Sequence, residues 1–128
     1  MFVSHSSKDR EAANTIVDAV EQAGFPCWIA PRNISPGSDY DEEIVSASES
    51  GLAMLLIVSP RSGESRHVKR ELELAGEEGR SVVPVLIDGD GIPRALRYHL
   101  AGVHWVDARS ERGWLDSVKQ VLKPLIVP

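Results

Sequence analysis

Short runs of apolar residues alternate with longer segments of helical periodicity along this chain of 128 residues. Such alternation is typical of βαβ units, in which helices connect parallel strands. The run from Leu52 to Val58 is continuously apolar, as expected of a central strand covered on both faces. We therefore predict an α/β fold with a five-stranded parallel sheet and helices on both faces. The expected strands are Met1–Ser4, Cys27–Ala30, Leu52–Ser59, Val82–Ile87 and Val103–Val106.

Helical periodicity fills most of the segments between these strands. The first helix has Ser6 as its N-cap and Gly24 as its stop. Further helices are expected to begin near Ser38, Ser65 and Ser110. Their apolar stripes should face the sheet; these are Ala13, Ile16, Val17 and Val20, then Ile44, Val45 and Ala47, then Val68, Leu72 and Ala75, and finally Trp114, Leu115, Val118, Val121 and Leu122.

Composition narrows the classes of function. An apolar fraction of 42% and a charged fraction of 26% suit a single globular domain over residues 1–128. A net charge of −5 opposes the electrostatic attraction on which binding to nucleic acid or anionic membranes depends. Cys27 is the only cysteine, which excludes an internal disulfide and suits a reducing cytoplasm. We expect no bound metal, no nucleic-acid partner and no membrane partner.

Three polar segments follow the first three strands. They are Ser4–Asp9, Pro31–Gly37 and Pro60–Glu71. In an open parallel sheet, ligands bind in the crevice beyond the carboxyl ends of the strands. The three segments should meet there and form the functional site.

Glu71 is the strongest candidate for chemistry in these segments. With Ser65 as the helix cap, His67 and Glu71 lie four residues apart on one helix face, at the edge of the buried stripe. A carboxylate at the mouth of a crevice can be partly desolvated and suited to acid, base or electrostatic work. Taken alone, a glutamate close to Lys69 and Arg70 is more often a solvated surface charge, so both interpretations stay open at this point.

The first two loops carry weaker signals. His5, Ser6 and Ser7 stand at a helix N-terminus, where they can hold a phosphate or a ribose hydroxyl, or simply cap the helix. The second loop is bracketed by prolines and projects Arg32 and Ile34, which favours contact with a partner over an inert surface turn.

In this order, the segments resemble the TIR (Toll/interleukin-1 receptor) domain family, in its bacterial, NAD-cleaving effector style. The resemblance implies a flavodoxin-like TIR fold over nearly the whole chain. The segments that carry it are Phe2–Asp9, the BB loop Pro31–Gly37, Leu56–Pro60 with the following Ser65, Val68 and Glu71, and Gly102–Trp105.

Many members of this family cleave the bond between nicotinamide and ribose in NAD⁺, releasing nicotinamide with ADP-ribose or a cyclic relative. The resemblance thus implies an NAD⁺ nucleosidase with NAD⁺ as substrate and no separate cofactor. Where the family usually has tryptophan, four residues before its glutamate, this chain has His67. Arg32, Lys8 and Arg66 are cations available to the pyrophosphate. The implied catalytic residue is Glu71, and the implied substrate-binding residues are His5, Ser6, Ser7, Arg32, Asn33 and His67.

The resemblance also implies activation by homo-oligomeric assembly with other TIR domains, through BB-loop residues Arg32 and Ile34, in an immune or antiphage effector. We expect a sensor domain after Pro128. The alternatives are a non-catalytic TIR scaffold and a deoxyribosyltransferase-like enzyme, although the latter leaves the BB loop unexplained. A phosphorelay receiver is excluded because Ser59 stands where its aspartate is required.

Overall fold

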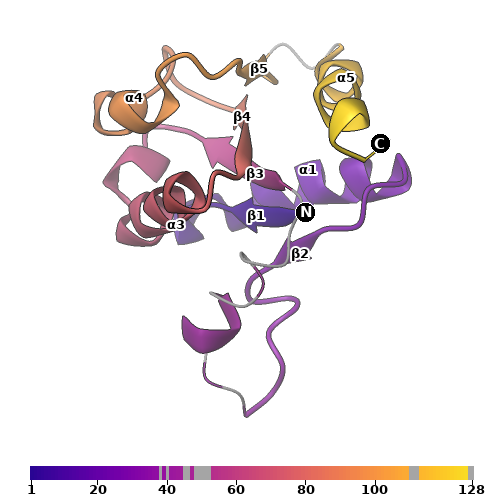
Figure 1. Ribbon diagram of the computed structural model, residues 1–128, viewed down its shortest axis with the longest axis vertical. Coiled ribbons are helices and arrows are strands. Elements are labelled where there is room, and N and C mark those ends of the chain that lie inside the picture. Colours follow the sequence, from indigo (N-terminus) through magenta and orange to yellow (C-terminus); the bar gives the residue numbers. More distant parts are fainter. Residues whose placement is uncertain (38, 40, 45–46, 48–52, 110–112, 127–128) are drawn as a thin grey trace.

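A computed structural model describes residues 1–37, 39, 41–44, 47, 53–109 and 113–126 of the chain. Its five strands form one parallel sheet in the order β2-β1-β3-β4-β5 (Figure 1). The predicted α/β class and five-stranded parallel sheet are therefore confirmed. The strands are β1 (Phe2–Ser4), β2 (Trp28–Ile29), β3 (Ala53–Val58), β4 (Ser81–Leu86) and β5 (Val106–Asp107).

The last strand lies further along the chain than predicted. The expected strand began at Val103, but the Val103 amide donates to the carbonyl of Leu100 and so closes a turn. Gly102 in this turn has a φ of +77°, a conformation that glycine adopts without steric cost. Within the described residues after α4, pairing with β4 is limited to Val106 and Asp107.

The helices follow the predicted pattern, but α1 and α5 begin later than predicted, the latter at Trp114. Ser6 caps a short 3-10 helix, η1, by accepting from the Lys8 amide at 3.3 Å, and α1 begins after Asp9 rather than after Ser6. Residues 41–44 are helical, with Ile44 buried as predicted, whereas Ser38, Val45 and Ser110 lie outside the described residues. The elements are η1 (Ser7–Asp9), α1 (Arg10–Gln22), η2 (Ser62–Glu64), α3 (Arg66–Glu77), α4 (Arg94–Leu100) and α5 (Trp114–Ile126).

The sheet separates two hydrophobic cores, one on each face. Along β3, Leu55 and Ile57 point into the core shared with α1 and α5, while Met54 and Leu56 point into the core shared with α3 and α4. In Figure 1, α3 and α4 lie on one side of the sheet and α5 on the other. Since successive side chains of a strand face opposite ways, a strand covered on both faces must be apolar throughout, as β3 is.

A polar network that is buried at Asp9 and Ser59 and partly exposed at Arg61 joins the loops at the carboxyl edge of the sheet. Asp9, only 4% exposed, accepts hydrogen bonds from the Ser59 hydroxyl and, at 2.6 Å, from Arg61 Nε. Arg61 also donates to Asp88 at 2.8 Å. The network thereby fixes the chain that leads from β3 into α3. Among the described residues, no helix is both long and apolar enough to cross a membrane.

Because Leu55 is fully buried in the middle of the sheet, Leu55→Ala should lower the free energy of unfolding by about 2–5 kcal/mol, as measured by urea denaturation. The same substitution at Leu115, which is only partly buried on α5, is the matched control and should cost less. A loss below about 1 kcal/mol at Leu55 would contradict its central position.

Candidate active site

The side chain of Glu71 is buried at the edge of the core, beside the carboxyl end of β1. Ser65 caps α3 by accepting from the Val68 amide at 3.3 Å, which sets where the helix begins, and the buried apolar residues of α3 set the face that meets the sheet. Glu71 shares that face with Leu72 and is 8% exposed. The alternative of a solvated surface charge is therefore wrong for Glu71.

Ser4 makes a direct hydrogen bond to this carboxylate. Its hydroxyl, itself fully buried, donates to Glu71 Oε1 at 2.8 Å. Burial raises the pKa of Glu71 from 4.5 to about 7, and the hydrogen bond from Ser4 opposes that rise. Near neutral pH, Glu71 is consequently present in both its ionised and its protonated form.

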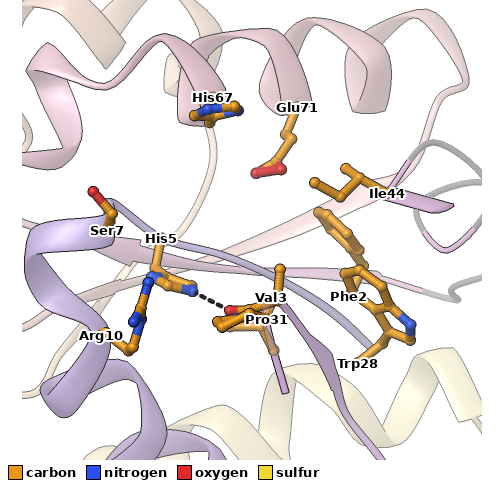
Figure 2. Close-up of a pocket in the computed structure, with 11 residues that line it drawn as sticks. Phe2, Val3, His5, Ser7, Arg10, Trp28, Pro31, Ile44, His67 and Glu71 are labelled. Carbon is orange, nitrogen blue, oxygen red and sulfur yellow. Dashed lines mark hydrogen bonds between the residues drawn. The ribbon is translucent and has the colours of Figure 1, made fainter. Parts of the chain in front are cut away.

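A cavity of about 150 Å³ opens beneath Glu71. Its polar side is formed by Glu71, His67, His5, Ser7 and Arg10, which come from α3 and from the start of the chain (Figure 2). Pockets for drug-sized ligands measure about 300–1,000 Å³. This cavity can therefore enclose only one end of a large ligand such as a dinucleotide.

The opposite wall of the cavity is apolar. Phe2 and Trp28 stack with their ring centroids 5.5 Å apart and their planes 17° from parallel. Ile44 and Pro31 complete this wall, and Figure 2 shows Phe2, Trp28 and Ile44 together across from His5. A flat heteroaromatic ring would find an apolar surface here and polar groups opposite it.

His5 connects two of the loops that the sequence placed at this site. One ring nitrogen, Nε2, lies 3.0 Å from the carbonyl oxygen of Ala30, and Nδ1 lies 2.8 Å from that of Ser6. Carbonyl oxygens only accept hydrogen bonds, so a neutral ring donates to one of them and an imidazolium donates to both. A ring that carries a proton on Nε2 donates to the Ala30 carbonyl and so holds the first loop against the base of the BB loop.

Of the substrate-binding residues implied by the resemblance, His5, Ser7 and His67 line the cavity together with Glu71. Arg32 is turned elsewhere: its guanidinium forms two hydrogen bonds of 2.9 Å to Glu21 on α1 and one of 3.0 Å to the carbonyl of Cys27. A substrate role for Arg32 stays a prediction, and it would require this ion pair to open.

Asn33 and Ser6 also lie outside the cavity lining. Asn33 Oδ1 accepts from the Ile29 amide at 2.9 Å, which closes the turn after β2, and Ser6 is the cap described above. Ile34, expected to project outward, is half-buried and packs against the core on the α3 side. Roles for these residues in substrate binding or assembly likewise stay predictions.

Sequence reasoning missed two polar groups at this site. Ser4 is the last residue of β1, so its position at the carboxyl edge was a usable signal, but its partner lies 67 positions away in the sequence. Arg10 lines the cavity although Lys8, Arg32 and Arg66 were the cations singled out. Arg10 is the first residue of α1, directly after the 3-10 turn η1, which the sequence pattern did not predict.

The raised pKa of Glu71 makes the stability of the fold depend on pH. Between pH 4.5 and about pH 7 the native state binds more protons than the unfolded state, so the free energy of unfolding falls as pH rises through this window. The side chain introduced by Glu71→Gln does not ionise, so its burial does not lower the free energy of unfolding as pH rises. The free energy of unfolding of the variant should therefore rise relative to that of wild type between pH 5 and pH 8, by up to about 3 kcal/mol at pH 8.

Urea denaturation at several pH values checks this expectation. Glu73→Gln is the matched control, because it removes an exposed carboxylate two residues further along α3, and it should follow the wild-type curve. A difference between Glu71→Gln and wild type that does not change with pH would contradict the burial of Glu71.

Comparison with known proteins places this geometry in a family. A family model described as TIR domain matches residues 1–122. A stimulator of interferon genes protein from Magallana gigas is 33% identical over 105 residues, covering 75% of this chain and 25% of that protein. A probable 2′ cyclic ADP-D-ribose synthase from Brachypodium distachyon is 28% identical over 90 residues, covering 69% of this chain and 40% of that protein.

The fold is shared with solved structures as well. A metazoan TIR-STING receptor from C. gigas, in complex with 2′,3′-cGAMP, superposes with a TM-score of 0.75 at 28% identity, covering 94% of this chain and 38% of that chain. The chain thus spans between a quarter and two fifths of the length of the two curated relatives. Since the family model accounts for nearly all of its residues, the chain belongs to the TIR domain family.

Proposed function

We propose that this domain cleaves the bond between nicotinamide and ribose in NAD⁺, with Glu71 as the catalytic carboxylate. The observation that carries the proposal is a buried carboxylate at the end of a ring-sized cavity, with an aromatic wall opposite. The naming of one relative as a probable 2′ cyclic ADP-D-ribose synthase supports the same substrate class, because such a product contains the ADP-ribose part of NAD⁺.

The chemistry needs one well-placed carboxylate. When the bond from ribose C1′ to the pyridinium nitrogen breaks, its electron pair goes to the nitrogen, and nicotinamide leaves as a neutral molecule. The ribose becomes an oxocarbenium-like cation, which a nearby carboxylate stabilises electrostatically. Water then adds to C1′ and loses a proton to give ADP-ribose, or a hydroxyl of the ADP-ribose itself adds and gives a cyclic product.

The residues around the cavity match successive parts of NAD⁺, from the nicotinamide ring to the pyrophosphate. The nicotinamide ring would lie between His67 and the Phe2–Trp28 wall, with its ribose under Glu71. The pyrophosphate would extend toward Ser7 and Arg10, where a guanidinium and the start of α1 favour negative charge. The adenosine half would lie outside the enclosed cavity.

The ionised form of Glu71 is the active one in this scheme. Its pKa of about 7 therefore ties activity to pH, and the rate should rise as pH increases through neutrality. Keeping a carboxylate in such a site lowers stability in favour of function, as many active sites do.

The biological setting belongs to the same proposal. The domain would act in the cytoplasm as an assembly-activated immune or antiphage effector, through contacts between TIR domains that involve Arg32 and Ile34 of the BB loop. The matched region covers 25% and 40% of the two curated relatives, which supports a further domain in the complete protein; we propose a sensor domain, placed after Pro128.

A non-catalytic TIR scaffold is the second candidate, and His67 favours it. Where this family usually has tryptophan, an imidazole offers a smaller stacking surface to nicotinamide. The two candidates differ in one observable, which is whether nicotinamide is released at all.

Glu71→Gln should lower nicotinamide release from NAD⁺ by at least about 100-fold, because it removes the charge that stabilises the oxocarbenium ion while keeping the shape of the side chain. Release is measured by chromatography on concentrated or artificially clustered protein, with Glu73→Gln as the control that retains activity. If wild type releases no nicotinamide under any clustering condition, the scaffold is correct; if Glu71→Gln is as active as wild type, the site is misassigned.

His67→Trp should preserve or raise activity, because an indole ring extends the stacking surface over nicotinamide. The expected change is a lower KM for NAD⁺ with little change in kcat. A large fall in kcat would instead show that the imidazole of His67 has a chemical role of its own.

A further inference from the structure

The hydroxyl of Ser4 is in direct contact with the carboxylate on which the proposed reaction depends. Ser4 is fully buried, and its hydroxyl lies 2.8 Å from Glu71 Oε1. Among the residues that the structure describes, it is the only hydrogen-bond partner of the Glu71 side chain. A buried carboxylate with one fixed donor is a strongly oriented group.

β1 holds the Ser4 hydroxyl in a fixed place because it is an inner strand of the sheet. β1 lies between β2 and β3 in the sheet, and Ser4 is in register with Leu56 of β3. The donor is therefore held by a strand paired on both sides, while the acceptor is carried by α3. The contact fixes the distance between these two elements at the point where the cavity opens.

The second carboxylate oxygen of Glu71 has a different environment. Among the described residues, every fully buried side-chain oxygen or nitrogen has a hydrogen-bond partner. Oε2 of Glu71 has no such partner within those residues, so it must be accessible to solvent. Glu71 lines the cavity, and Figure 2 shows its carboxylate directed into the space between His67 and Ile44. One oxygen is anchored to β1, and the other remains accessible.

We infer that Ser4 is a positioning residue for the reaction: its hydroxyl anchors Oε1 of Glu71, turns Oε2 toward the substrate and favours the ionised form of the carboxylate. This inference rests on the proposed NAD⁺ cleavage for its kinetic consequences, though not for its effect on the ionisation of Glu71. A hydroxyl donor stabilises a carboxylate over a carboxylic acid, since only the former offers a full negative charge to accept the bond.

Other polar groups near Glu71 do not duplicate this contact. His67 comes from the same helix, whereas His5, Ser7 and Arg10 approach from the loop after β1 and from the start of α1. Each lines the same cavity, yet within the described residues none is hydrogen-bonded to Glu71. Removal of the Ser4 hydroxyl should therefore leave the carboxylate without a direct donor.

The first test is the pH profile of kcat/KM for nicotinamide release by the clustered 128-residue chain. Ser4→Ala should move the acid limb of the profile to higher pH by about one unit, which is the size expected for one hydrogen bond to a charged group. The loss of activity should be greater at pH 7 than at pH 9, where the carboxylate forms in both proteins. Ser4→Cys, which keeps the shape of serine and a weaker donor, should give an intermediate shift.

Ser59→Ala is the matched control. Ser59 is also fully buried at the carboxyl end of a strand, but its hydroxyl donates to Asp9 instead of Glu71. This variant should lose stability without moving the acid limb. An equal loss at every pH in Ser4→Ala, with an unmoved limb, would show that Ser4 is merely structural and would overturn the inference.

The second test does not depend on NAD⁺ cleavage. A ¹³C NMR titration of the Glu71 side-chain carboxyl, assigned by its absence from Glu71→Gln, should show a higher midpoint in Ser4→Ala than in wild type. The same midpoint in both proteins would overturn the inference even if NAD⁺ is cleaved. A raised midpoint together with no nicotinamide release by wild type would uphold the Ser4 contact and reject the proposed function.

Discussion

The carboxylate of Glu71, buried against the end of β1, is the constraint on which the geometry of the proposed site depends. A buried carboxylate costs less free energy when a donor meets it, and here the donor is a serine on an inner strand. The parallel order of the sheet makes this possible, because it places the carboxyl end of β1 beside that of β3, from which the chain turns into α3. The strand order of the sheet therefore brings together the residues of the site.

The loops at the carboxyl edge of the sheet have separate structural roles. The network of Asp9, Ser59 and Arg61 is charge-assisted and only partly buried, and it holds the segment that leads into α3 without lining the cavity. His5 joins the first loop to the start of the BB loop through the carbonyl of Ala30. Rigid support beneath a partly open cavity is the general design of a site in which one reacting group must be held in a fixed place.

The sequence predicted those parts of the fold that depend on periodicity. The continuous apolar run of β3 identified the central strand, and the stripe of α1 identified the helix beneath it, because burial imposes those patterns directly. β5 was misplaced because two residues of pairing leave almost no periodic signal, and the turn that shifts it depends on Gly102 and a backbone hydrogen bond.

The site was predicted less completely, for a different physical reason. Sequence spacing placed His67 and Glu71 on one helix face, but it does not report partners that are distant along the chain. The donor to Glu71 is 67 residues away, and the carboxylate that holds Arg32 lies on α1, 11 residues before it. Glu71 could also be read as a surface charge until its burial was known, since the neighbouring lysine and arginine are equally visible in the sequence.

The most direct test of this account is an NMR titration of ¹⁵N-labelled protein with carba-NAD⁺, in which a methylene replaces the ring oxygen of the nicotinamide ribose, so that the oxocarbenium ion cannot form. The account predicts that the backbone amides of His5, His67 and Glu71 shift on binding while those of α5 do not, because the cavity lies on the α3 side of the carboxyl edge. Saturable binding that shifts amides elsewhere and leaves those three unchanged would contradict it.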